Sequence, residues 1–136
     1  MNTPKIALIT GANRGIGYSI ARHLTDAGIN VVGTYHANED EAKAAEIALS
    51  HEKAKLRMLQ LDIANHTSFT DFAQRVKALL ANEFWLQGLN YVVQNAGNII
   101  HTRFDAAPSE QLDNQYTIHF KGPYLLTVVL FPIHIP

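Results

Sequence analysis

Short apolar runs alternate with segments of helical character along the whole chain, and this order restricts the fold more than any other feature. Four runs have the length and composition of buried strands, and they lie at 5–10, 30–35, 55–62 and 89–97. Four segments have helical spacing or a polar, alanine-rich composition, and they lie at 15–27, 38–53, 68–81 and 109–130. Strands that alternate with helices predict a parallel sheet with helices on both faces.

Right-handed crossovers then restrict the strand order to 3-2-1-4. We therefore expect an α/β fold, a Rossmann-like doubly wound parallel sheet, in a single domain over residues 1–136. Individual residues mark the expected helix ends. Gly28 is placed to close the first helix, Asn38 and Glu41 have the spacing of a capping box, and Ser109 is placed to cap the last helix after Pro108.

Composition excludes several classes of protein. Apolar residues make up 47% of the chain and charged residues 17%, which is typical of a globular protein. The net charge of -1 gives no electrostatic reason to expect nucleic acid or an anionic membrane as partner. The run LLTVVLFPIHIP is too short to span a bilayer. The absence of cysteine fits a cytoplasmic protein, and the dispersed histidines predict no metal site.

The stretch LITGANRGIG places three glycines between the first expected strand and the first expected helix. Gly11 permits a tight turn, while Gly15 and Gly17 allow a ligand and the neighbouring strand to approach the helix start. Free N–H groups and the helix dipole at that point suit a pyrophosphate. A plain strand-to-helix turn is the alternative. A kinase-type phosphate loop is not expected, because no Gly-Lys-Ser/Thr follows.

Four stretches resemble, in order, the motifs of the short-chain dehydrogenases/reductases. TGANRGIG is similar to the family's Thr-Gly-x-x-x-Gly-x-Gly turn, and LDI at 61–63 to its Leu-Asp-Val/Ile. QNAG at 94–97 is similar to its Asn-Asn-Ala-Gly, and IHFKGPYLLT to part of its long fourth crossover helix. The resemblance covers essentially the whole chain as the N-terminal half of such a protein. It implies an oxidoreductase that transfers hydride to a carbonyl or from an alcohol.

The resemblance also implies a bound nicotinamide dinucleotide. The implied cofactor-binding residues are Gly11, Asn13, Arg14, Gly15, Ile16, Gly17, Tyr35, His36, Asp62, Ile63, Asn95, Ala96 and Gly97. Asp62 would hydrogen-bond the adenine amine, and Asn95 would hold its strand beside the nicotinamide ribose and tie the glycine turn in place. The alternatives are that Asp62 only ends a strand or caps a turn, and that Asn95 and Gly97 are only turn residues.

The end of the second expected strand bears on the choice between NAD and NADP. An acidic residue there usually binds the ribose 2′-hydroxyl, but the matching Tyr35 lies between Thr34 and His36. Arg14 can pair with a 2′-phosphate, unless it is only a solvated surface side chain. His36 resembles an arginine position of NADP-preferring members, and Asn38 is a third donor. NADP(H) is therefore the expected cofactor, ahead of NAD(H).

The family's catalytic Tyr-x-x-x-Lys motif does not occur in this sequence. None of the tyrosines at 18, 35, 91, 116 and 124 has a lysine four residues later. Since the motif normally follows the next strand, we expect a truncated, catalytically incomplete member of the family. His119 stands where the family's long helix has an Asn of the proton relay, and a histidine can relay protons. A histidine that is hydrogen-bonded by a helix neighbour is the alternative.

A non-enzymatic function is the alternative to an oxidoreductase. The chain is alternatively a non-catalytic nucleotide-binding or oligomerising module, as a pseudoenzyme or a truncated gene product. The last helix carries Tyr116, Phe120, Tyr124, Leu125 and Val128, which are either core or interface residues. Without a second half to cover this helix and one sheet edge, we expect a homo-oligomer or pairing with a chain that supplies the missing half.

Overall fold

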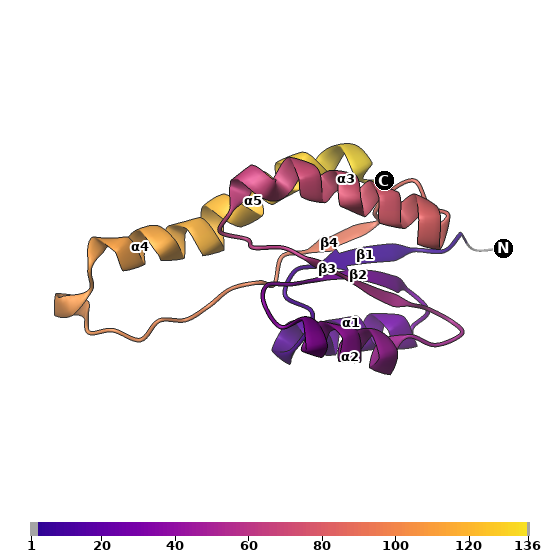
Figure 1. Cartoon of the computed structure of the whole chain (residues 1–136), viewed down its shortest axis with the longest axis horizontal. Helices are drawn as coiled ribbons and strands as arrows, with labels where there is room; N and C mark the ends of the chain where they lie inside the picture. Colours follow the sequence, from indigo (N-terminus) through magenta and orange to yellow (C-terminus); the bar gives the residue numbers. More distant parts are fainter. Residues whose placement is uncertain (1–2, 136) are drawn as a thin grey trace.

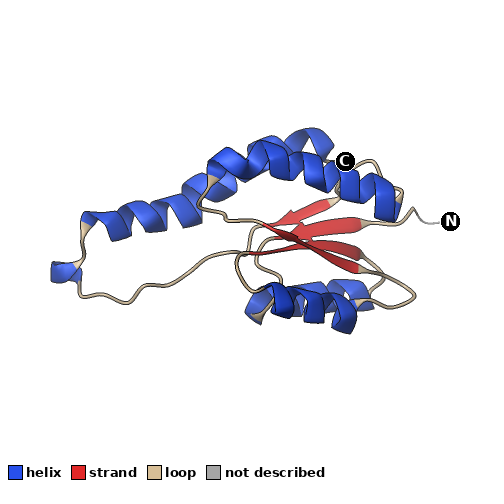
Figure 2. Ribbon diagram, viewed as in Figure 1, coloured by secondary structure: helices blue, strands red, loops and turns tan. Residues whose placement is uncertain are grey.

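The computed structural model describes residues 3–135, so residues 1–2 and 136 of the expected domain lie outside the described part. The four strands form one parallel sheet, and they are β1 (Ile6–Ile9), β2 (Asn30–Tyr35), β3 (Leu56–Gln60) and β4 (Tyr91–Val93). Their order is β3-β2-β1-β4, which confirms the expected topology. Because all four strands run the same way, their carboxyl ends meet at one edge of the sheet (Figure 2).

Helices cover both faces of this sheet (Figure 1). One face carries α1 (Gly15–Asp26) and α2 (Glu39–Leu49), and the other carries α3 (Phe69–Leu79) and α5 (Gly122–Leu130). Helix α4 (Ser109–Tyr116) follows a long loop and extends away from the sheet (Figure 1). The doubly wound arrangement that the sequence predicts is therefore present.

Two apolar cores lie on opposite faces of the sheet. Leu8 of β1 belongs to the core that contains Phe72 of α3 and Leu126 of α5. Ile9 belongs to the other core, together with Ala21 of α1. Successive strand residues point to opposite faces, so one strand contributes to both cores. This burial on both sides explains why the strands read as continuous apolar runs.

The start of α2 is built largely as expected. The Asn38 side-chain oxygen accepts a hydrogen bond from the Glu41 backbone N–H at 3.0 Å, so Asn38 is the N-cap. Glu41 does not complete a capping box, because its carboxylate accepts a hydrogen bond from the side-chain amide of Asn13. Helix α2 ends at Leu49 and not near residue 53, since Ser50 has extended backbone and its hydroxyl bonds the start of β3.

Two further helix ends were expected from single residues. Gly28 has φ +85° and its N–H donates to the carbonyl of Thr25 at 3.0 Å, which confirms that it closes α1. Ser109 does not cap the last helix, because it is already the first helical residue. The extended backbone of Pro108 makes the turn into that helix, and no side chain caps it.

Residues 109–130 form one continuous helical path that is not regular. Helix α4 passes through the π-helical segment Thr117–Lys121 before it becomes α5. Pro123 follows directly in the first turn of α5. A proline inside a helix lacks the N–H for the bond to the preceding turn, and its ring clashes there. A wider π turn relieves that clash, so the irregularity has a local cause.

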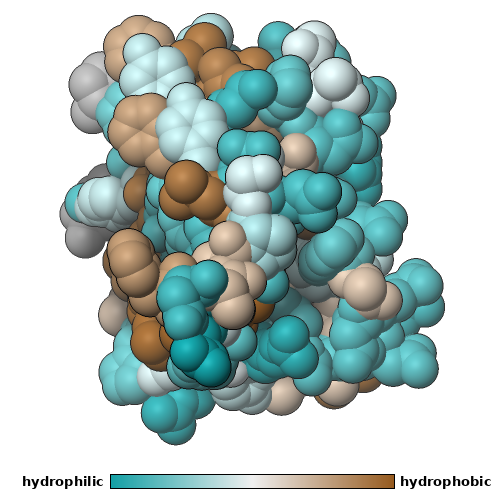
Figure 3. Space-filling model, turned by 90° about the vertical axis from the view of Figure 1, so that its left-hand side faces the viewer, coloured by the Kyte–Doolittle hydropathy of each residue, from teal (hydrophilic) through white to brown (hydrophobic). Residues whose placement is uncertain are grey.

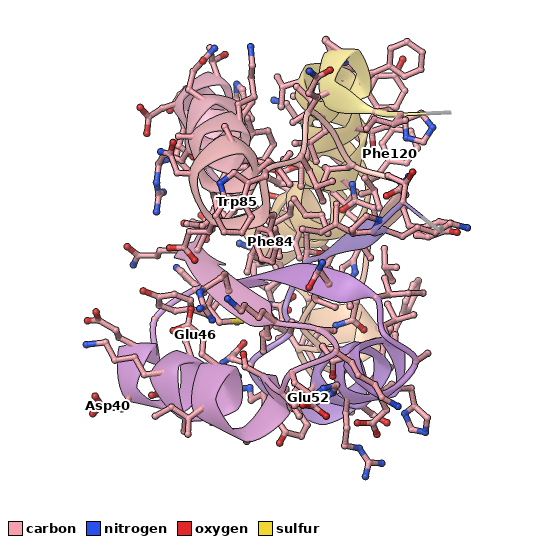
Figure 4. The ribbon with its side chains drawn as sticks, turned by 90° about the vertical axis from the view of Figure 1, so that its right-hand side faces the viewer. Asp40, Glu46, Glu52, Phe84, Trp85 and Phe120 are labelled. Carbon is pink, nitrogen blue, oxygen red and sulfur yellow. The ribbon has the colours of Figure 1, made fainter. Side chains whose placement is uncertain are left out.

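The two outer edges of the sheet differ. Side chains bond the free backbone groups of β3: the Glu46 carboxylate accepts from the Met58 N–H at 2.7 Å, and Arg75 donates to the Gln60 carbonyl at 3.2 Å. Glu46 lies between α2 and the sheet (Figure 4). Within residues 3–135 no side chain bonds the outer backbone groups of β4. The β3 edge is therefore closed to another strand. On the other edge, a parallel bridge pairs Leu89 with His134 just before β4, and the outer edge is open from Tyr91 to Val93.

Across residues 3–135, none of the helices combines the length and the apolar composition that crossing a lipid bilayer requires.

Candidate nucleotide-binding site

A cavity of about 740 Å³ opens at the carboxyl ends of the strands. Ligands of open α/β sheets bind at this edge, where the strand order reverses. The volume lies within the range of roughly 300–1,000 Å³ that is common for small-molecule sites. The cavity is lined by Gly11, Asn13, Arg14, Gly15, Thr34, Tyr35, His36, Ala37, Asn38, Leu61, Asp62, Ile63, Ala64, Asn95, Ala96, Gly97, Asn98, Asn114 and Ile118.

Most of the residues that the motifs implied lie together in this cavity, and the exceptions are Ile16, Gly17 and His119. Ile16 is 74% exposed at the start of α1. Sequence reasoning missed the lining residues Ala37, Leu61, Ala64, Asn98, Asn114 and Ile118, and the cofactor role was not assigned to Thr34. Leu61 and Ile118 lie within the LDI and IHFKGPYLLT motifs but had no cofactor role assigned to them. Ala37, Ala64, Asn98 and Asn114 belong to no motif, because their position depends on how loops and the last helix fold over the strand ends.

Gly17 supports the glycine turn instead of lining the cavity. A Cβ at this position would lie 2.1 Å from the carbonyl oxygen of Gly11 and 2.5 Å from Nδ2 of Asn95. Gly11 and Gly15 have φ values of +67° and +62°, a left-handed backbone that favours glycine. Gly11 and Gly15 are thus required for their left-handed backbone, and Gly17 is required because α1 lies too close to the turn for a side chain.

Asn95 and Thr10 lock the turn onto β4. The Asn95 side-chain amide donates to the carbonyl oxygens of Thr10 and Gly11, at 3.1 Å each. The Thr10 hydroxyl oxygen accepts in return from the backbone N–H groups of Asn95 and Ala96, at 3.0 and 2.9 Å. The Thr34 hydroxyl oxygen accepts from the Gly11 N–H at 3.1 Å. The network joins β1, β2 and β4, and it contains the tie between Asn95 and the turn that the resemblance implied.

Helix α1 begins at the cavity without a capping group. Arg14 occupies the N-cap position, its side chain does not cap, and the first turn holds no acidic residue. Helix α2 differs, because Asn38 caps it and its first turn contains Glu39, Asp40 and Glu41. The free N–H groups and the dipole of α1 are therefore uncompensated, and such a helix start suits a phosphate group.

A second polar group of side chains lies beyond the end of β2. His36 Nε2 is 3.6 Å from Asp62 Oδ2, and Asp62 Oδ1 accepts from the Ala64 N–H at 2.9 Å. Arg14 is exposed, and its guanidinium makes no hydrogen bond or ion pair with any part of the chain between residues 3 and 135. Tyr35 and His36 bring no carboxylate to this end of the cavity, where Arg14 and His36 are the basic side chains and Asp62 is the acid.

His119 lies beside the cavity and not in its lining. Its Nε2 hydrogen-bonds the carbonyl oxygen of Asn98 at 2.8 Å, so Nε2 carries the proton. The partner is in the loop after β4, and the alternative of a helix neighbour is therefore wrong. A Cβ on Gly97 would lie 2.7 Å from the His119 ring, so the ring packs on bare backbone. His119 thus holds the loop along the cavity, and its relay role stays a prediction.

The described residues 3–135 hold no group of three or more His, Asp or Glu side chains that could bind a metal ion.

The sequence matches the family model for short chain dehydrogenase over residues 5–135. The chain belongs to this family. One relative among the short chain dehydrogenases is the polyprenol dehydrogenase of Danio rerio, which is 31% identical over 135 residues. That match covers 93% of this chain and 37% of the relative.

Two solved structures of the family have the same fold. An NADPH-bound carbonyl reductase from chicken fatty liver has a TM-score of 0.80 at 25% identity, and it covers 96% of this chain and 48% of that protein. A metagenomic short-chain oxidoreductase in complex with NADP has a TM-score of 0.80 at 27% identity, with 95% and 56% covered. The chain thus spans only part of the length of the short chain dehydrogenases it matches, while the resemblance seen in its motifs is confirmed.

Proposed function

We propose that this short chain dehydrogenase chain binds NADP(H) at the carboxyl ends of its strands, as the nucleotide-binding part of an oxidoreductase. The observation that carries the proposal is the uncapped start of α1, which opens onto the 740 Å³ cavity. The bare backbone of the glycine turn lies directly before it, and Asn95 and Thr10 hold that turn rigid. A rigid, uncompensated set of N–H groups at a cavity fits a pyrophosphate.

Each end of the cavity has a proposed role. The free N–H groups at the start of α1, with that of Gly15 first, hold the pyrophosphate, and Asp62 accepts from the adenine amine. Ile63 lies beside Asp62 in the lining, and Asn95, Ala96 and Gly97 border the part proposed for the nicotinamide ribose. When bound, NADPH supplies a hydride to a carbonyl carbon.

The preference for NADP(H) over NAD(H) is part of the proposal. No carboxylate at Tyr35 or His36 repels a 2′-phosphate, and the free guanidinium of Arg14 is available to pair with it. The chicken carbonyl reductase and the metagenomic oxidoreductase, whose structures carry NADPH and NADP, support this choice.

Replacing Arg14 by alanine tests the phosphate preference. We expect Arg14→Ala to weaken NADPH binding about tenfold or more, because a charge-assisted hydrogen bond contributes roughly 1.5–3 kcal/mol. NADH lacks the 2′-phosphate, so its binding should change by less than about threefold. Titration calorimetry with both nucleotides measures the difference. An equal loss for both would show that Arg14 does not read the 2′-phosphate.

The proposed reaction class, hydride transfer to a carbonyl or from an alcohol, comes from the family. Residues 1–136 hold no Tyr-x-x-x-Lys, so the chain alone lacks the residue pair that moves the proton. We expect carbonyl reduction by the purified chain to stay at background when NADPH absorbance is followed with aldehyde and ketone substrates. A clear rate that His119→Gln abolishes would contradict this expectation and assign the proton transfer to His119.

A non-catalytic, associating module is the second candidate, and the surface of the last helix favours it. Tyr116, Phe120 and Tyr124 stack in a ladder with ring centroids 5.6 and 6.2 Å apart, and all three are exposed. Apolar side chains gather along one side of the end from which α4 extends (Figure 3). A second copy, or a chain that completes the sheet beside β4, would cover this surface. Sedimentation velocity tests the idea, and a strictly monomeric chain that binds no partner half would contradict it.

A further inference from the structure

The last helix holds Asn98, the residue directly after Gly97, at two points. The Gln115 side-chain amide donates to Oδ1 of Asn98 at 2.9 Å. His119 Nε2 hydrogen-bonds the carbonyl oxygen of Asn98 at 2.8 Å. Gln115 and His119 are four residues apart, so their side chains lie on the same side of the helical path and reach the same residue. Asn98 is therefore fixed through both its backbone and its side chain.

This arrangement leaves the amino group of the Asn98 side chain free. A side-chain amide has one acceptor oxygen and one NH2 group with two donors. The oxygen faces Gln115, and no protein group between residues 3 and 135 accepts a hydrogen bond from the NH2 group. Asn98 is exposed and lines the 740 Å³ cavity. An oriented but unused donor thus stands at the cavity wall.

The position of Asn98 indicates which part of a dinucleotide it meets. Asn98 directly follows Gly97, which borders the part of the cavity proposed for the nicotinamide ribose. Its carbonyl oxygen contacts His119, which stands where the family has a residue of the proton relay. Both neighbours place Asn98 at the end of the site where the nicotinamide would lie. The ribose at that end offers uncharged oxygens that accept hydrogen bonds.

We propose that the NH2 group of Asn98 donates a hydrogen bond to an oxygen of the ribose beside the nicotinamide, and that Gln115 is the positioning residue that orients this amide. The inference rests on the proposed NADP(H) site. It extends that site to the last helix, which carries none of the cofactor-binding residues that the motifs implied. Gln115 acts only through Asn98, because its own side chain is not part of the cavity lining.

The test is calorimetric titration of the full chain with three ligands that share the adenosine half. NADPH carries the second ribose and the nicotinamide, 2′-phospho-ADP-ribose keeps only the second ribose, and 2′,5′-ADP has neither. Asn98→Leu replaces the amide by an apolar group of similar size. We expect it to raise the dissociation constants of the first two ligands about three- to tenfold, as loss of one neutral hydrogen bond does. The dissociation constant of 2′,5′-ADP should stay within about twofold.

A variant of Gln115 tests the positioning role. Gln115→Leu removes the hydrogen bond that orients the amide and leaves Asn98 in place, so the same two ligands should bind about threefold more weakly. In the double variant with Asn98→Leu, the change at Gln115 should have no further effect. Gln111→Leu is the matched control, one turn earlier in α4 and outside the cavity lining, and should leave all three dissociation constants unchanged. Urea unfolding shows whether each variant is folded.

Three results would overturn the inference and leave the proposed function in place. Equal losses for all three ligands in Asn98→Leu would show that Asn98 acts on the fold or on the adenosine half. A loss confined to NADPH would assign the amide to the nicotinamide carboxamide. Unchanged dissociation constants would show that Asn98 contacts no part of the ligand. If the unmodified chain binds none of the three ligands, the proposed function itself fails, and the inference with it.

Discussion

Gly17→Ala should destabilise the chain by about 3 kcal/mol and weaken NADPH binding at least tenfold. The added Cβ would lie 2.1 Å from the carbonyl oxygen of Gly11 and 2.5 Å from Asn95 Nδ2. The Gly11 carbonyl belongs to the backbone, and the Asn95 amide is held by two hydrogen bonds, so neither atom can move aside without cost. The glycine turn or the start of α1 must therefore shift to make room for the Cβ. Alanine is the better helix former by about 1 kcal/mol, so a loss of stability can come only from this contact.

Gly15→Ala is the matched control, two residues earlier in the same turn. No atom lies within 4 Å of the Cβ that it would add, so only its left-handed backbone opposes the change. We expect a cost of about 1 kcal/mol. Urea unfolding of both variants gives the two values. If Gly17→Ala were no less stable than Gly15→Ala, the close approach of α1 to the turn would be wrong.

Thr10→Val should remove the two hydrogen bonds that tie the end of β1 to the residues after β4, without changing the shape of the core. Thr10 is 1% exposed, and its hydroxyl oxygen accepts from the N–H groups of Asn95 and Ala96. Valine leaves both part-buried N–H groups without this acceptor, at a cost of about 1–3 kcal/mol each. We expect a total loss of roughly 2–5 kcal/mol in the free energy of unfolding, and weaker NADPH binding because the turn is released.

Thr10→Ser separates the hydrogen bonds from the packing. Serine keeps the accepting oxygen and removes one methyl group, so about 1 kcal/mol should be lost. The same urea series measures it, with NADPH titration as the second readout. Equal losses in the valine and serine variants would show that the hydroxyl contributes nothing and that the network around Asn95 does not hold the turn.

The sequence was sufficient for the architecture because alternation of strands and helices leaves few topologies. Strand order, the end of α1 at Gly28 and the Asn38 cap all follow from local rules, and the structure confirms them. Most motif residues from Gly11 to Gly97 line one cavity for the same reason, since each motif follows a parallel strand whose end meets the same edge.

The sequence patterns did not predict contacts between residues that lie far apart in the chain. Glu41 has the spacing of a capping box, yet its carboxylate accepts a hydrogen bond from the side-chain amide of Asn13, which is 28 residues away in sequence. His119 finds its partner in the Asn98 carbonyl, because the last helix crosses the loop after β4. Thr10 is the first residue of the TGANRGIG motif, but the spacing of that motif does not show that its hydroxyl oxygen accepts from the N–H groups of Asn95 and Ala96. Such pairings depend on tertiary distance, which periodicity and spacing do not contain.

One measurement tests most directly whether the cavity at the strand ends is the dinucleotide site. Amide chemical shifts of the isotope-labelled chain would be recorded during titration with NADPH. We predict that the largest changes fall on Gly11, Gly15, Ile63 and Ala96, with little change on the closed β3 edge around Met58. Changes that cluster instead along the groove beside Phe120, Tyr124 and Phe131, or no changes at all, would contradict the account.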